Sequence, residues 1–192
     1  MKPVSRGTTS SSSWERFVAL PADDRRELVG GELVETEMPT DLHEHIVLAI
    51  GFFFRGWVRE HGGFAFGSGF KIRIDDDHGF VPDLHLYHPK NRARRSAQAL
   101  LDGAPDVVVE ILSPGSATYD KKTKLLGYAR IGVAEYWIVS PEEKSLERLV
   151  LRRGKYVVEE VLVSGDIVRP PRFPGLEVIV SELFDFPEKT KR

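Results

Sequence analysis

Two carboxylates lie within apolar runs that read as β-strands, and they are the residues best placed to do chemistry. Glu110 belongs to residues 106–112, where nearly all its neighbours are aliphatic, and Asp83 interrupts the apolar run of residues 80–87. Burying an unpaired carboxylate is costly unless a cation, a set of hydrogen bonds or a proton compensates it. If the two strands are neighbours in one sheet, the acids converge. Mg²⁺ or Mn²⁺ suits such a pair, because a hard cation takes one or two protein carboxylates and completes its shell with water and phosphate.

A helix predicted after the Glu110 strand adds further polar groups. Asp120, Lys124 and Tyr128 follow one another at spacings of four, which places them on one helix face. Lys124 could then reach the metal site and stabilise the charge that develops on a reacting phosphate, with Tyr128 holding either Lys124 or a phosphate oxygen. The backbone carbonyl of Ile111 is a candidate third metal ligand.

Each acid also has a purely structural explanation. Glu110 could form a buried ion pair with Lys124 or Arg130 and hold no metal. Asp83 follows a proline and could be an edge-strand residue that faces water.

Zinc and thiol chemistry find little support. The chain has no cysteine, which excludes disulfides, thiolate zinc sites and cysteine nucleophiles. His43 and His45 are two residues apart on a predicted helix, so they point in nearly opposite directions and do not form a ligand pair. His43 alone is expected to cap this helix or to line the cleft.

Hydrophobic periodicity and turn residues predict an α/β (α+β) fold, in which a mixed sheet is flanked by helices. The predicted elements are a short helix over residues 14–20, a hairpin over 27–35, a long helix over 43–61, a strand over 70–74, a polar and partly helical connection over 91–101, a helix ending near 131, a strand over 135–139 and a hairpin over 148–163. Only the Glu110 strand and the strand at 135–139 are joined by a helical crossover, so those two are expected to be parallel.

Composition favours one globular domain. With 192 residues and 41% hydrophobic content, residues 14–187 suit a single domain, flanked by a serine-rich arm over 1–13 that is expected to be disordered and a flexible tail over 188–192. The formal net charge is −2, so no overall positive field favours nucleic acid, and any such contact must be local. No hydrophobic signal core opens the chain, which favours a cytoplasmic protein without a membrane partner.

The ordered set of motifs resembles a known family. It consists of Pro82-Asp83, then 110–114 (EILSP), then Asp120, Lys124 and Tyr128, then 132–137 (GVAEYW), preceded by 26–33 (RELVGGEL) and by Pro39-Thr40 with His43. This set is similar to the Uma-two family of restriction-endonuclease-like proteins, within the PD-(D/E)XK nuclease superfamily. The resemblance covers nearly everything from Trp14 to about Tyr156. It implies a restriction-endonuclease-like fold and a magnesium-dependent endonuclease that cleaves DNA.

The chain departs from the usual superfamily motif at one position. A lysine normally stands two residues after the second acid, but here that residue is Leu112. The resemblance implies that the lysine has moved to the helix, where Lys124 matches the family's position. The superfamily often adds an acid from the first core helix, for which Glu44 is the candidate and Glu32 the alternative.

Three functional hypotheses follow. The first is a Mg²⁺-dependent endonuclease that hydrolyses phosphodiester bonds of DNA, with Asp83 and Glu110 as metal ligands and Lys124 as the charge-stabilising residue. The second is a catalytically inactive nuclease-like module that binds nucleic acid or a protein. The third is a structural homo-oligomer, expected as a homodimer, because residues 52–54, Trp57, Phe184 and Phe186 supply more aromatic surface than one core requires.

Overall fold

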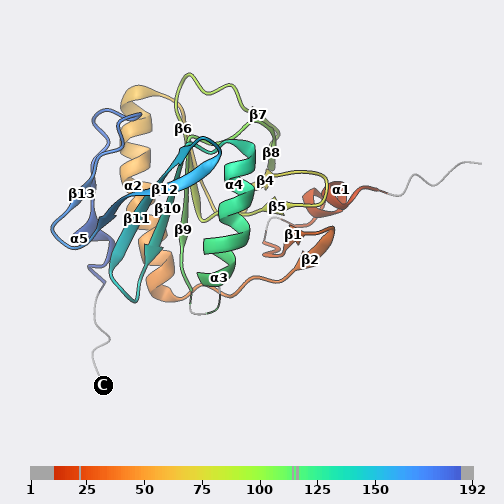
Figure 1. The fold of residues 1–192 in the computed structure, drawn as a ribbon, viewed down its shortest axis with the longest axis horizontal. Coiled ribbons are helices and arrows are strands. Elements are labelled where there is room, and N and C mark those ends of the chain that lie inside the picture. Colours follow the sequence, from red (N-terminus) through yellow and green to blue (C-terminus); the bar gives the residue numbers. More distant parts are fainter. Residues whose placement is uncertain (1–10, 22, 114, 116, 187–192) are drawn as a thin grey trace, which may run out of the picture.

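The predicted fold class is confirmed: the protein has two mixed β-sheets flanked by helices (Figure 1). The structure is a computed structural model that describes residues 11–21, 23–113, 115 and 117–186. Most of the predicted arm and all of the predicted tail lie outside these residues. Within them, the arm prediction is wrong for Ser12 and Ser13: Ser12 caps the first helix through its side chain, and the helix begins at Ser13.

The larger body of the protein is built on a sheet whose strand order is β12-β11-β10-β9-β6-β3. Its strands are β3 (Phe64–Gly67), β6 (Leu84–Tyr87), β9 (Val107–Ile111), β10 (Glu135–Ser140), β11 (Ser145–Arg152) and β12 (Lys155–Leu162). As predicted, β9 and β10 are parallel, and every other neighbouring pair in this sheet is antiparallel.

A second sheet, of order β2-β1-β5-β4-β8-β7, lies beside the first. Its strands are β1 (Glu27–Val29), β2 (Glu32–Val34), β4 (Lys71–Arg73), β5 (Gly79–Phe80), β7 (Arg94–Arg95) and β8 (Ala99–Asp102). The hairpin of β1 and β2 turns at Gly30 and Gly31, both with positive φ, as predicted. The connection over 91–101, however, contains β7 and β8 and no helix, because Ala99 and Leu100 are buried while β8 pairs with β4.

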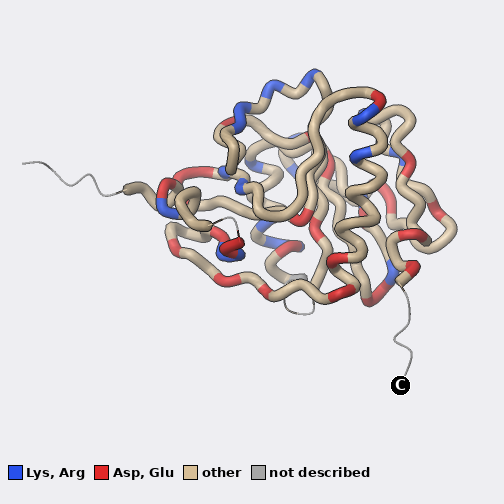
Figure 2. The backbone as a smooth tube through the Cα atoms, turned by 180° about the vertical axis from the view of Figure 1, so that it is seen from behind, with Lys and Arg blue, Asp and Glu red and all other residues tan. Residues whose placement is uncertain are grey.

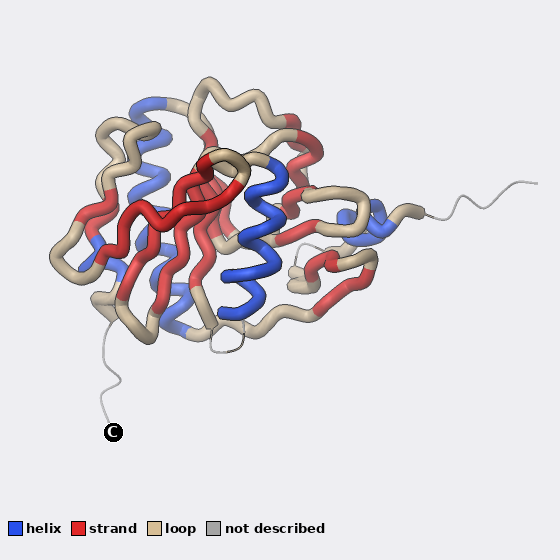
Figure 3. The backbone as a smooth tube through the Cα atoms, in the orientation of Figure 1, coloured by secondary structure: helices blue, strands red, loops and turns tan. Residues whose placement is uncertain are grey.

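Helices cover both faces of the larger sheet (Figure 3). The helices are α1 (Ser13–Val18), α2 (Asp41–His61), α3 (Ala117–Tyr119), a π-helical turn η1 (Asp120–Lys124), α4 (Leu125–Ile131) and α5 (Val180–Leu183). Two further short strands, β13 (Ile167–Val168) and β14 (Val178–Ile179), pair with each other. On one face, α2 packs Ile46, Ile50 and Phe54 against Val107 and Val109. On the other, Tyr128 of α4 packs against Val108. The side chains of β9 therefore alternate between α2 and the α3–η1–α4 run.

The ends of α2 follow local capping rules. The helix begins at Asp41, two residues before the predicted start, because the Thr40 side chain accepts the backbone N–H of His43. It ends at His61, and Gly62 closes it with a φ of 81°. None of the helices in the described residues is long and apolar enough to cross a membrane.

Candidate active site

Asp83 and Glu110 face one another because of how β6 and β9 pair. The antiparallel register places Leu84 opposite Val109. Asp83 precedes Leu84 and Glu110 follows Val109, so the two acids lie across from one another. Asp83 does not lie within a strand, as the sequence suggested, but immediately before β6, where Pro82 separates β5 of the smaller sheet from β6 of the larger one. Glu110 lies within β9 and points towards the helical run.

Glu110 is buried and fully engaged. Its side chain is 3% exposed, one oxygen lies 3.0 Å from Lys124 Nζ, and the other accepts a hydrogen bond from the Tyr128 hydroxyl at 2.7 Å. Burial raises the pKa of Glu110 well above its usual range; Lys124 opposes this shift, while the negative charges of Asp83, Asp120 and Glu27 add to it. Arg130, the other predicted partner, pairs instead with Asp75.

Lys124 joins three carboxylates. Its ammonium lies 3.0 Å from Glu110, 3.2 Å from Glu27 and 3.4 Å from Asp120, and its side chain is only 7% exposed. Burial alone would lower the pKa of Lys124, but the three acids raise it well above its ordinary value, so the lysine stays charged. Three carboxylates around one ammonium leave a surplus of negative charge, which either a proton or a further cation can neutralise.

The spacing of the helical residues is not that of a regular α-helix. Asp120 and Lys124 lie in the π-helical turn η1, and Tyr128 lies one turn later in α4. The Tyr136 hydroxyl of β10 donates to the carbonyl of Asp120 at 3.2 Å, which ties the turn to the sheet. Single π-helical turns often occur at functional sites. The side chains of Asp120, Lys124 and Tyr128 nevertheless form one cluster with Glu110, as their spacing of four predicted.

Asp83 is held by two donors. One of its oxygens accepts the backbone N–H of Ile111 at 2.7 Å and lies 3.2 Å from Nε2 of His43. Burial lowers the pKa of His43, but the hydrogen bond and charge of Asp83 raise it more, so the pKa lies above its ordinary value. Ile111 thus contacts Asp83 through its amide, and a ligand role for its carbonyl stays a prediction. The expectation that His43 lines the cleft agrees with this position.

Among the described residues, neither Glu44 nor Glu32 forms an ion pair with Lys124, and a role for either as the additional acid stays a prediction. Glu44 is about half exposed and lies 3.9 Å from Nδ1 of His43, a nitrogen that has no hydrogen-bond partner among the residues the structure describes. Glu32 is exposed on β2. The acid that reaches Lys124 is Glu27 of β1, whose side chain is 1% exposed.

Glu27 is positioned by hydrogen bonds from two different segments. One of its oxygens accepts the backbone N–H of Val81 at 2.7 Å, and the other accepts the Tyr119 hydroxyl at 2.8 Å. Burial raises its pKa above the usual range, although Lys124 and these hydrogen bonds lower it. The signal that could have identified Glu27 is the one that identified Glu110: a carboxylate in a strand next to aliphatic residues, here Leu28 and Val29.

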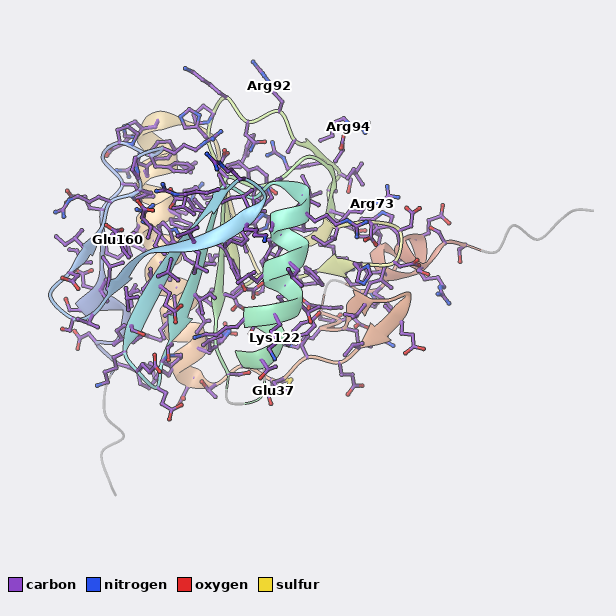
Figure 4. All side chains as sticks on the ribbon, viewed as in Figure 1. Glu37, Arg73, Arg92, Arg94, Lys122 and Glu160 are labelled. Atoms are coloured by element: carbon purple, nitrogen blue, oxygen red, sulfur yellow. The ribbon has the colours of Figure 1, made fainter. Side chains whose placement is uncertain are left out.

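These groups line a cavity of about 510 Å³ between the β1–β2 hairpin, the segment leading into α2 and the end of β9. Its lining includes Glu27, His43, Asp83, Glu110, Asp120 and Lys124. At its rim, the Gly115 N–H donates to the Glu37 carboxylate at 3.2 Å. Figure 4 shows Glu37 and Lys122 together at this end of the molecule. The cavity therefore has a charged floor that is largely shielded from water.

The donor set of this floor fits a divalent cation. Asp83 and Glu110 lie across from one another in the strand register and close enough for the charge of Asp83 to act on Glu110. A cation between them would relieve the surplus negative charge around Lys124. Among the described residues, no group of three or more His, Asp or Glu side chains has the geometry of a metal site. An ion here would thus be held by two protein carboxylates and complete its shell with water and phosphate, as Mg²⁺ commonly does.

Comparisons with known proteins concern the fold and the family of the chain. The chain resembles a crystal structure of "a putative nuclease belonging to DUF820" from Anabaena variabilis ATCC 29413, with a TM-score of 0.71 and 22% identity over 91% of this chain and 98% of the other. At this identity, the likeness concerns the fold. A search of curated proteins found no match. The sequence model of the Uma2 family, described as "Putative restriction endonuclease", matches residues 14–181. The chain therefore belongs to the Uma2 family of restriction-endonuclease-like proteins.

Proposed function

We propose that this protein is a magnesium- or manganese-dependent endonuclease that hydrolyses phosphodiester bonds of DNA. The observation that carries the proposal is the convergence of Asp83, Glu110 and Lys124 on the floor of one cavity, from a loop, a strand and a helical turn. The membership of a restriction-endonuclease family supports a nuclease, and the choice of metal and DNA goes beyond it. We place this activity in the cytoplasm.

The proposed roles follow from the contacts. Asp83 and Glu110 would hold the ion, which when bound supplies a Lewis acid for the phosphate and lowers the pKa of bound water. Lys124 keeps its proton and places a positive charge at the floor, where it can stabilise charge that develops on the phosphate. Tyr128 fixes the orientation of Glu110, and His43 with the Ile111 amide fixes that of Asp83. Glu27 and Asp120 position Lys124.

The test is cleavage of plasmid DNA, single-stranded DNA and RNA with Mg²⁺ or Mn²⁺. The proposal expects cleavage by the wild type and its loss in Glu110→Ala and Asp83→Asn. Asp102→Asn is the matched control, because Asp102 is an exposed acid on β8 whose only ion pair with a described residue is with Arg94. Equal activity in Asp83→Asn and Asp102→Asn would refute the assignment.

A catalytically inactive binding module is the second candidate, and one observation favours it. Both oxygens of Glu110 already have protein partners, as does one oxygen of Asp83. These contacts satisfy the buried carboxylate of Glu110 without a metal ion, as expected for the buried ion pair that was the structural alternative for this residue. Calorimetric titration with Mn²⁺ distinguishes the two, since a closed ion-pair network gives no binding heat that depends on Asp83 and Glu110.

A homodimer is also part of the proposal, on a narrower basis than the sequence suggested. Phe54 and Trp57 belong to the core, and Phe184 packs partly against it, so most of the aromatic surface is used within one chain. On the outer face of α2, Leu48 and Phe52 are 74% and 77% exposed. Sedimentation of the wild type and of Phe52→Ser over a range of concentrations tests whether this face joins two copies.

A further inference from the structure

The lining of the cavity carries an excess of negative charge. Eight carboxylates contribute to it, against two permanently charged cations, Arg25 and Lys124. Lys124 is already surrounded by three acids, whereas Arg25 is exposed and forms no ion pair with a described residue. Asp23, Glu35 and Glu37 are exposed acids of the same lining. Around the mouth, therefore, one free cation faces several negative charges.

Besides Arg25 in the lining and Lys122 nearby, other cations that are unpaired among the described residues lie away from the cavity. Lys90 and Arg92 are exposed and make no ion pair with any residue that the structure describes. Figure 4 shows Arg92 and Arg94 at the opposite end of the molecule from Glu37 and Lys122. In Figure 2, blue positions gather along the upper edge, whereas red ones follow the lower edge between the hairpin and α2. A duplex attracted to the basic end would thus not be guided to the cavity.

The depth of the catalytic groups imposes a second restriction. The side chains of Glu27, Glu110, Asp120 and Lys124 are 1%, 3%, 4% and 7% exposed. A scissile phosphate must enter the cavity to meet them. A duplex carries one negative charge per about 1.7 Å of its axis, so its flanking phosphates would be pressed against the acidic rim. A flexible single strand can present one phosphate and keep the others away.

Apolar side chains at the mouth offer a contact for bases. Val34 and Met38 are 43% and 74% exposed and line the same cavity. Unpaired bases pack against apolar side chains, whereas paired bases are stacked inside a duplex and cannot reach them. We propose that the cavity binds a single-stranded polynucleotide, held by one or two phosphates and by bases at Val34 and Met38. This inference rests on the proposed nuclease function and narrows its substrate.

Salt dependence gives a quantitative test. For single strands, the slope of log affinity against log salt is about −0.7 for each phosphate contact. With one or two contacts, raising the salt from about 50 to about 200 mM should weaken binding by about sevenfold at most. A protein that makes six to ten phosphate contacts with a duplex loses about a thousandfold or more over that range.

The experiment is fluorescence anisotropy with labelled single-stranded DNA, RNA of the same sequence and a hairpin duplex, in Mg²⁺, with cleavage followed on the same samples. The wild type should bind both single strands at least tenfold more tightly than the duplex, with the shallow salt slope. Arg25→Ala should weaken binding and flatten the slope, and Met38→Ser should weaken binding without changing the slope. The matched control is the double variant Lys90→Ala/Arg92→Ala, which should bind like the wild type.

The outcomes separate this inference from the proposed function. Duplex binding as tight as single-strand binding, or loss of binding in the Lys90→Ala/Arg92→Ala variant, overturns the inference and leaves the nuclease proposal standing. Binding of none of the three probes also overturns it. Selective single-strand binding without cleavage supports the inference and counts against hydrolysis. A preference for the DNA or the RNA strand identifies which polynucleotide the site takes.

Discussion

Lys124→Met tests the charge balance at the centre of the site. In the wild type, this lysine is the cation shared by Glu27, Glu110 and Asp120. At an effective dielectric constant of about 20, unit charges 3.2 Å apart interact by about 5 kcal/mol. Removing one partner of a buried ion pair typically costs about 3–5 kcal/mol. We therefore expect Lys124→Met to lower the free energy of unfolding by about 3–5 kcal/mol near neutral pH. A catalytic lysine on a solvated helix face would not have this effect.

The loss should depend on pH in a defined direction. Burial already raises the pKa of both Glu110 and Glu27 in the wild type, and neighbouring negative charges raise the pKa of Glu110 further. Because Lys124 lowers both pKa values, its loss raises them again. A group whose pKa is raised in the folded state stabilises the fold fully below its unfolded pKa, and this contribution is lost as the pH rises through the folded pKa. The deficit of the variant should thus be largest near pH ~8 and shrink as the pH approaches the ordinary carboxyl pKa of about 4.3.

Urea unfolding followed by tryptophan fluorescence, at about pH 5 and about pH 8, measures both effects. Lys122→Met is the matched control, because Lys122 is exposed on the same turn and should change stability by no more than about 0.5 kcal/mol. Adding Glu27→Gln to Lys124→Met should restore part of the loss, since it removes one uncompensated carboxylate. A loss equal at both pH values, or no loss at all, would refute the charge-balance explanation.

Three further predictions concern the metal, the lysines and the first helix. Asp83→Asn and Glu110→Gln should each weaken Mn²⁺ binding at least tenfold, as measured by calorimetry. The affinity of the wild type for Mn²⁺ should begin to fall at a pH above the usual carboxyl pKa as the pH is lowered, because the pKa of Glu110 is raised and protons compete with the ion. If cleavage is observed, Lys124→Met, which removes the positive charge, should lose on the order of a hundredfold in rate. Lys122→Met should change only salt-dependent affinity, and equal losses would indicate a general phosphate-binding face. A truncation that starts at Trp14 removes the Ser12 cap and should cost about 1 kcal/mol, seen as a lower melting temperature, while one that starts at Ser11 should melt like the full chain.

The sequence by itself determined most of the local elements and indicated Asp83 and Glu110, of which only Glu110 lies within a strand. Glycines with positive φ set the hairpin turn and the end of α2, and the helical crossover predicted the parallel pair of β9 and β10. The aliphatic neighbours of Glu110 indicated a buried carboxylate, and the spacing of four indicated that Lys124 and Tyr128 share its surroundings. These features depend on neighbours in the chain, so they can be read from it.

Only the tertiary structure decided how distant segments meet. Residues 91–101 contain strands because the buried Leu100 belongs to β8, which pairs with β4, a strand that precedes β5 and β6 in the chain. The register of β6 against β9 places Asp83 across from Glu110, and no local pattern specifies that register. Glu27 reaches Lys124 because the β1–β2 hairpin packs beside η1, almost a hundred residues later in the chain. The approach of Glu27 to Lys124 is therefore a consequence of packing between β1 and η1 and not of any motif.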